Sequence, residues 1–157
     1  MISIAKKHLF VKRSGIPKAG KGLFTKTDIA KGCRIVEYEG RITTWKEALQ
    51  SVAFNSYIFY INRNHVIDAM PYTKALGRYA NDANGIYKMR SLINNAKYVI
   101  ENAKVFIQAT KNINAGDEIL VSYKKEYWDV IKHNNLCTPK QKRRNKLKKL
   151  KKRKRLN

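Results

Sequence analysis

The sequence has few of the residues that fix small domains covalently or hold metals. Its 157 residues include two cysteines, Cys33 and Cys137, far apart and with no CxxC or Cys/His cluster beside either. A structural zinc site is therefore not expected, although one disulfide stays open in principle. No apolar run approaches the roughly 18 residues of a membrane helix, and the N-terminus lacks the apolar core of a signal peptide. These absences predict an intracellular, reduced protein.

Acidic residues are also scarce, with 11 Asp and Glu against 34 Lys and Arg and a net charge of +23. Residues 140–157 hold 12 of the bases and no acid, and the rest of the chain still has 22 bases against 11 acids. A surface of this kind favours acidic partners such as nucleic acid or nucleoprotein. We expect residues 140–157 to form a disordered tail because they have almost no apolar side chains. Residues 1–139 are then one folded domain.

Short β-rich runs separated by turn residues make up most of that domain. Residues 57–60 and 65–68 are two such runs with a hairpin turn between them. Only one good helix interrupts the strands, and it starts at Thr44, where Thr44 and Glu47 match a capping box. Residues 71–95 lack periodicity, and so long an irregular stretch in a compact domain is usually functional. We therefore predict a mainly β fold. The remaining predicted strands are 33–38, 97–100, 105–110 and 118–123.

Two turns repeat a short pattern. Residues 28–32 (DIAKG) and 112–116 (NINAG) each place an Asp or Asn four residues before a glycine, and each precedes an apolar strand. The repetition indicates that the same turn chemistry is used twice.

Five motifs then follow one another in a fixed order. They are Gly20-Lys21-Gly22-Leu23-Phe24, Val66-Ile67-Asp68-Ala69, residues 77–83 (GRYANDA), Asn95-Ala96-Lys97-Tyr98, and residues 109–119 (ATKNINAGDEI) shortly before Tyr123. Over roughly residues 10–128 this order resembles the SET-domain family of protein lysine methyltransferases. The resemblance implies the SET-domain β-clip, with small sheets, short helices and a pseudoknot in which the segment near Asn81 and the strand ending at Tyr123 thread together.

The resemblance also implies a cofactor, S-adenosyl-L-methionine, that enters opposite the substrate lysine. By their positions in the motifs, the residues implied to bind this cofactor are Gly20, Lys21, Gly22, Phe24, Arg78, Asn81, Asp82, Tyr123, Tyr127 and Trp128. Tyr123 is implied as a catalytic residue that orients the amine, and no metal is implied.

Methyl transfer needs a neutral lysine amine, whose ordinary pKa is about 10.4. A desolvated aromatic channel lowers this pKa and stabilises the developing methylammonium by cation–π attraction. Tyr57, Phe59, Tyr60 and Tyr123 are the candidates to line it, with Tyr57 and Tyr60 as further catalytic candidates. Because strands alternate faces, Tyr57 and Phe59 share one side and Tyr60 takes the other, so at least one is expected to be ordinary core.

Other interpretations stay open for single residues. Gly20 and Gly22 alone would indicate a tight turn, and Asn81 alone a turn residue. Tyr127 and Trp128 fit a structural clasp as well as a surface for adenine. Asp82 and Ala83 replace the His-Ser that is usual in the family.

The predicted function is methylation of a lysine in a histone or another basic chromatin protein. The alternative is a non-catalytic nucleic-acid or chromatin-binding module. The tail fits nucleic acid contact, nuclear import or its own methylation. The chain is loosely similar to compact viral and bacterial family members, which would place it in a host cell. Homodimerisation stays open, and no membrane partner is expected.

Overall fold

The computed structural model describes residues 3–50, 55–85, 87–123 and 127–128. It divides into two units, residues 1–122 and 123–157, and each is considered by itself. The boundary that the sequence predicts between residues 139 and 140, and the tail that follows it, lie outside the described residues.

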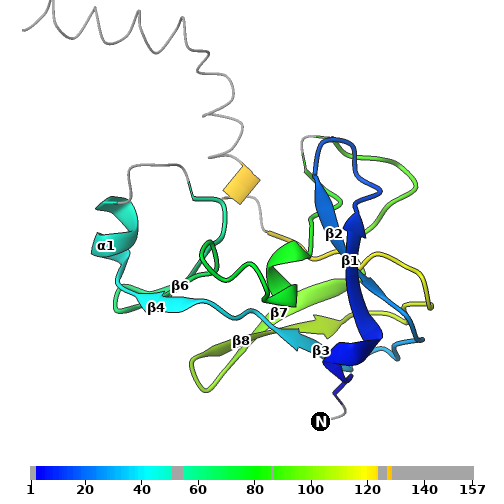
Figure 1. Ribbon diagram of the computed structural model, residues 1–157, viewed down its shortest axis with the longest axis horizontal. Coiled ribbons are helices and arrows are strands. Elements are labelled where there is room, and N and C mark those ends of the chain that lie inside the picture. Colours follow the sequence, from blue (N-terminus) through cyan, green and yellow to red (C-terminus); the bar gives the residue numbers. More distant parts are fainter. Residues whose placement is uncertain (1–2, 51–54, 86, 124–126, 129–157) are drawn as a thin grey trace, which may run out of the picture. The chain divides into compact units, whose positions relative to one another are not determined.

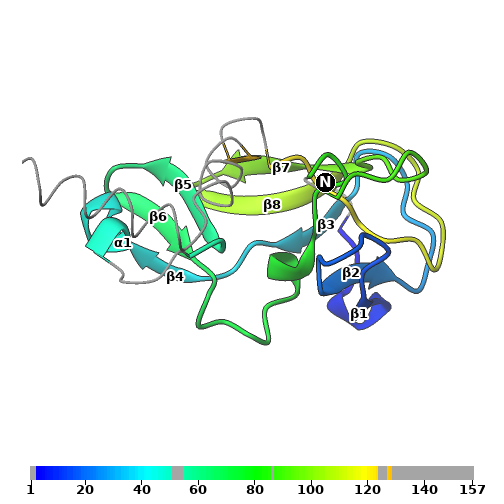
Figure 2. The same cartoon turned by 90° about the horizontal axis from the view of Figure 1, so that it is seen from above.

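Three small antiparallel sheets build the first unit (Figure 1). Strand β1 (Leu9–Arg13) pairs with β2 (Lys21–Thr25). The second sheet has the order β3 (Arg34–Glu37), β8 (Lys104–Ala109), β7 (Ala96–Glu101), and the third has the order β4 (Arg41–Thr43), β6 (His65–Asp68), β5 (Ile58–Asn62). Figure 2 shows the sheets in a row, with β3–β8–β7 in the middle.

Helices are few and short in the described part of the first unit. They are η1 (Lys6–His8), α1 (Trp45–Gln50) and η2 (Leu76–Tyr79). The mainly β fold predicted from the sequence is therefore confirmed. The irregular character of residues 71–95 is confirmed as well, since η2 is the only helix or strand that lies wholly within the described part of that stretch.

The capping box starts α1 as predicted. The Glu47 backbone N–H donates to Thr44 Oγ1 at 3.3 Å, and Glu47 Oε2 accepts from the Thr44 backbone N–H at 3.0 Å. These bonds satisfy amides that have no partner inside the helix. The pKa of Glu47 is lowered from its ordinary 4.5 to about 2, mainly by the side-chain hydrogen bond from Thr43 and then by the hydrogen bonds from Thr44.

The two repeated turns pair with each other. Ile29 and Ile113 form a reciprocal bridge, with N–H to O distances of 2.8 and 2.9 Å. Outside this bridge Asp28 Oδ1 accepts from the Ala115 N–H, and Asn112 Oδ1 accepts from the Lys31 N–H. The repeated sequence pattern is thus a pair of matching turns that cap one another, and the leading Asp and Asn are needed for this exchange.

Residues 118–121 are threaded between segments that are distant in the sequence. The Ile119 N–H donates to Leu23 O at 2.8 Å, the Val121 N–H donates to Asn81 O at 2.8 Å, and Leu120 O accepts from the Asn95 and Ala96 N–H groups. Because each residue pairs with a different neighbour, the predicted strand 118–123 forms single bridges and not a regular ladder. This segment pairs with Asn81, as the resemblance implied, and the pseudoknot itself stays a prediction.

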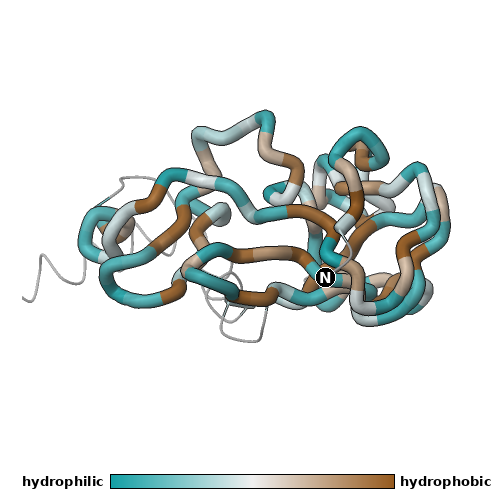
Figure 3. Tube along the Cα trace, turned by 90° about the horizontal axis from the view of Figure 1, so that it is seen from below, coloured by the Kyte–Doolittle hydropathy of each residue, from teal (hydrophilic) through white to brown (hydrophobic). Residues whose placement is uncertain are grey.

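The core of the first unit follows the strands. Its fully buried side chains include Leu23, Ile35, Ile107, Ile119 and Val121. Figure 3 shows short hydrophobic stretches along the chain, separated by hydrophilic ones. No helix of the described residues is long and apolar enough to cross a membrane.

Candidate functional site

A buried carboxylate lies where the threaded segment meets the glycine loop. Glu118 is 8% exposed. Its Oε1 accepts from Ser14 Oγ at 2.7 Å and from Asn81 Nδ2 at 3.2 Å, and its Oε2 accepts from the Gly15 N–H at 2.8 Å. A buried charge is costly unless several donors satisfy it. Here three donors from two distant segments converge on one side chain, which ties those segments together.

Asn81 is attached to the glycine loop through its side chain and to the threaded segment through its backbone. Its Nδ2 donates to Lys21 O at 2.9 Å as well as to Glu118. Its carbonyl oxygen accepts from the Val121 N–H. The structure therefore brings Lys21, Gly22 and Asn81, three residues predicted from the sequence, into one neighbourhood.

The two loop glycines are required for different reasons. Gly20 has a φ of +77°, which side-chain-bearing residues rarely adopt, and the space that its Cβ would take is open. Gly22 is buried, and a Cβ there would lie 2.2 Å from Glu118 Oε1. Gly20 thus lets the chain turn, and Gly22 lets it approach Glu118.

Phe24 lies on the same strand and is almost fully buried at 5% exposure. Its ring stacks on Phe10 of the paired strand at 5.7 Å, and Lys12 Nζ lies 4.2 Å from its centroid. In this structure the ring of Phe24 packs the β1–β2 hairpin that carries the loop.

Arg78 and Asp82 are held by different neighbours, Arg78 by residues that precede the irregular stretch and Asp82 by residues within it. The Arg78 guanidinium lies 4.0 Å from the Tyr57 ring centroid and donates to Met70 O. Asp82 is buried, and its Oδ1 accepts from the Asn84 N–H and from Asn94 Nδ2, each at 2.8 Å. These contacts link Arg78 to Met70 and Asp82 to Asn84 and Asn94, and contact of Arg78 or Asp82 with a cofactor stays a prediction.

Tyr57, Phe59 and Tyr60, three of the predicted channel aromatics, lie on two different faces, as the alternation of side chains along a strand requires. Tyr57 and Phe59 pack against a cluster that contains Tyr38, whose hydroxyl donates to Tyr57 O at 3.0 Å. The ring centroids of Tyr98 and Phe59 lie 4.9 Å apart, and the two rings meet edge to face. Tyr60 is 49% exposed and contacts Trp45 on α1. The structure thus groups Tyr57 with Phe59 and places Tyr60 apart from them.

The second unit, considered by itself, contains an aromatic trio. Tyr123 stacks on Trp128 at 5.9 Å with an interplanar angle of 14°, and Tyr127 meets both rings edge to face. Such contacts are worth roughly 0.5–1.5 kcal/mol each beyond area burial. The trio is consistent with the clasp interpretation of Tyr127 and Trp128, and their proposed contact with adenine stays a prediction.

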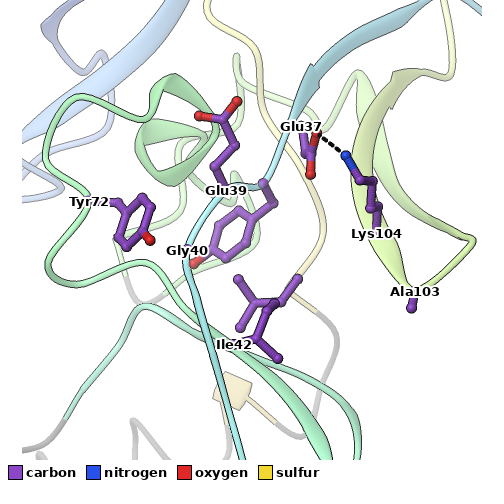
Figure 4. A pocket seen from close by; sticks show the side chains of 9 residues that line it. Glu37, Glu39, Gly40, Ile42, Tyr72, Ala103 and Lys104 are labelled. Atoms are coloured by element: carbon purple, nitrogen blue, oxygen red, sulfur yellow. Dashed lines mark hydrogen bonds and ion pairs between the residues drawn. The ribbon is translucent and has the colours of Figure 1, made fainter.

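A separate hollow of about 240 Å³ lies beside β3 and β4 and contains none of the predicted site residues (Figure 4). Its two carboxylates are already matched by lysines, because Glu39 pairs with Lys6 and Glu37 with Lys104. We assign it no role. Among the described residues, no three His, Cys, Asp or Glu side chains gather where they could hold a metal ion.

The family model described as SET domain matches residues 20–124, well over half of the chain. The chain belongs to the SET-domain family. Among known proteins, this SET-domain chain is similar to the N-lysine methyltransferase KMT5A of Xenopus tropicalis, with 29% identity over 126 residues that cover 72% of this chain and 35% of that protein. It therefore spans about a third of the length of that relative.

A solved structure supports the same SET-domain fold. The methyltransferase domain of human PR domain-containing protein 2 aligns with a TM-score of 0.57 and 24% identity, covering 74% of this chain and 77% of that one. At this identity the likeness is one of fold.

Sequence reasoning missed Glu118 and Ser14 as parts of the site. Glu118 belongs to the last of the five motifs and stands directly before an apolar run, Ile119-Leu120-Val121. An acid that leads into a buried strand needs a partner, and that signal was present. Nothing in the sequence, however, points to Ser14 as one of the donors.

Proposed function

We propose that this chain transfers a methyl group from S-adenosyl-L-methionine to the side-chain amine of a lysine in a protein substrate. One observation carries the proposal: in a SET-family chain, the Lys21–Gly22 loop and Asn81 are joined around a single buried carboxylate, Glu118.

The residues of the loop suit that cofactor. Open space lies on the side of Gly20 where a Cβ would stand, so the backbone can approach a ligand closely. Both amide hydrogens of Asn81 are used by Lys21 and Glu118, which leaves its oxygen as an acceptor for a ligand donor. S-adenosylmethionine carries donors of this kind in its ammonium, hydroxyl and amino groups, and when bound it supplies an electrophilic methyl.

The contribution of the chain is then to align a neutral amine with that methyl, which is a positioning task. We place the amine near the half-buried aromatic cluster that contains Tyr57 and Phe59. Apolar walls disfavour the ammonium form and so lower the pKa of the lysine. Tyr123 is proposed to orient the amine through its hydroxyl, whereas the exposed position of Tyr60 makes it the weaker candidate.

For the substrate we propose a histone or another basic chromatin protein, in keeping with the family resemblance. The relative from Xenopus tropicalis is named as a lysine methyltransferase. This name supports lysine as the methylated residue, and the choice of a chromatin protein rests on the family resemblance. The Lys/Arg-rich segment 140–157 is proposed to contact nucleic acid phosphates, which would hold the enzyme near such a substrate.

The test is incubation of the protein with radiolabelled S-adenosylmethionine and core histones, beside a direct measurement of cofactor binding. We expect label on a histone lysine and loss of most of it in Tyr123→Phe. Tyr87→Phe is the matched control, since Tyr87 is an exposed tyrosine outside the proposed site, and it should label as the wild type does. Absence of both binding and label would exclude the enzyme and favour the binding module. Full activity in Tyr123→Phe would exclude the role of Tyr123.

A further inference from the structure

The side-chain amide of Asn81 has one orientation that suits its neighbours. Its Nδ2 lies 2.9 Å from Lys21 O and 3.2 Å from Glu118 Oε1. A carbonyl and a carboxylate both accept hydrogen bonds and have no hydrogen to give. Only the NH₂ group satisfies them, and the oxygen of the planar amide must then point away from both.

Glu118 is itself held in place, so it can impose that orientation. Ser14 Oγ donates to Oε1 and the Gly15 N–H donates to Oε2, and both donors come from the segment that follows β1. The missing side chain of Gly22 leaves room for the carboxylate, since a Cβ there would stand 2.2 Å from Oε1. Because the side chain is buried, water does not readily replace Asn81 as a partner.

We propose that Glu118 is a positioning residue for the cofactor. It directs the NH₂ of Asn81 inward, so that Asn81 Oδ1 accepts a hydrogen bond from a donor group of S-adenosylmethionine. The inference rests on the proposed function, because it presumes that this cofactor binds. Glu118 itself touches no reacting atom and acts through Asn81.

The first test uses the conservative variant Glu118→Gln. A glutamine amide has one acceptor and one donor where the carboxylate had two acceptors, so at least one of its three donors faces an N–H group. We expect the Kd of S-adenosylmethionine, measured by calorimetry, to rise about ten-fold. The kcat at saturating cofactor should change by less than about three-fold, since the reacting groups are untouched.

Asp117→Asn is the matched control. Asp117 is the neighbouring acidic residue, but it is exposed, and its side-chain Oδ2 accepts from the Asn114 N–H in its own turn. An asparagine oxygen can keep that bond. The Kd of S-adenosylmethionine for Asp117→Asn should stay within about two-fold of the wild-type value.

The second test exchanges the donor and the acceptor. In Asn81→Asp, two carboxylates face each other and neither can donate, so cofactor binding should weaken. In the double variant Asn81→Asp with Glu118→Gln, the glutamine NH₂ can donate to the aspartate, and a carboxylate oxygen still faces the ligand. We expect the double variant to bind the cofactor about five-fold more tightly than Asn81→Asp alone. A merely structural role of Glu118 would not produce this rescue.

Three results would overturn the inference: a wild-type Kd in Glu118→Gln, a double variant no tighter than Asn81→Asp, or loss of folding in Glu118→Gln. The last would make the carboxylate a requirement of the fold before it is one of the cofactor. A wild-type protein that does not bind S-adenosylmethionine would instead exclude the proposed function. The two failures are therefore distinguishable.

Discussion

The substitution Gly22→Ala tests the packing at the centre of the candidate site. The added Cβ would stand 2.2 Å from Glu118 Oε1 and 2.8 Å from its Cδ, closer than Cβ atoms come to other atoms in real structures. Overpacking of this kind costs about 1–3 kcal/mol. If Glu118 moves instead, Ser14, Gly15 and Asn81 lose a charged acceptor, and such bonds are worth about 1.5–3 kcal/mol.

The chain takes the cheaper of these two responses or a mixture of them, so we expect a loss of about 2–3 kcal/mol in the free energy of unfolding. For a chain of this length each kcal/mol lowers the Tm by about 2–4 °C. The Tm should therefore fall by about 4–12 °C. Thermal unfolding followed by circular dichroism measures the shift, and urea unfolding gives the free energy.

Gly15→Ala is the matched control. Gly15 also faces Glu118, but a Cβ there would stand 3.4 Å from Oε2 and 3.7 Å from Leu92, which is ordinary contact. We expect this variant to unfold within about 1 kcal/mol of the wild type.

A double variant isolates the cause of the loss. With Glu118→Ala in the background, the nearest remaining atom to the new Cβ is Phe24 Cε2 at 3.2 Å. The added cost of Gly22→Ala should then fall below about 1 kcal/mol, a coupling typical of residues in contact. If Gly22→Ala unfolds like the wild type, or if it costs the same in both backgrounds, the carboxylate does not occupy the position described and the reasoning fails.

Three further predictions concern the scaffold around the site. Thr44→Ala removes the N-cap of α1 and should cost about 1 kcal/mol in urea unfolding; an unchanged midpoint would contradict the cap. The pKa of Glu47 is lowered to about 2 from 4.5, so its carboxylate stabilises the fold fully above pH 4.5, and this contribution is lost as the pH falls through 2. The Tm of Glu47→Gln should thus lie below that of the wild type at neutral pH and meet it in strong acid, whereas a constant gap would exclude the ionised form as the cause. Asp82→Ala leaves the Asn84 N–H and Asn94 Nδ2 without their acceptor and should cost about 1–3 kcal/mol, and hydrogen exchange should then rise in residues 82–94 if the carboxylate orders that segment.

Local features were predictable where the sequence carries both partners of an interaction close together. The capping box of Thr44 and Glu47 spans three residues, and the β5–β6 hairpin turns at residues 63–64. In each case the stabilising bond is decided within one short segment. The alternation of Tyr57, Phe59 and Tyr60 was predictable for the same reason, since strand geometry alone fixes it.

Features that depend on distant segments were recognised only in part. Residues 118–123 have the composition of a strand, but their partners at Leu23, Asn81 and Asn95 come from three other places in the chain. Composition cannot show that the ladder is divided among them. The repeated turns are a similar case, because the likeness of residues 28–32 to 112–116 was visible, but their reciprocal pairing through Asp28 and Asn112 was not.

Gly22 shows how two separate physical constraints can require the same residue of a motif. The family resemblance assigns it to backbone contact with the cofactor, which alone would let Gly22→Ala weaken binding and leave stability unchanged. The structure adds a second constraint, because Glu118 occupies the space of a Cβ at this position. Glu118 in turn holds Asn81, so the glycine is required even before a ligand arrives. A motif of this kind reports the packing that builds the site as well as contact with its ligand, and only measurements of stability and binding on the same variants separate the two.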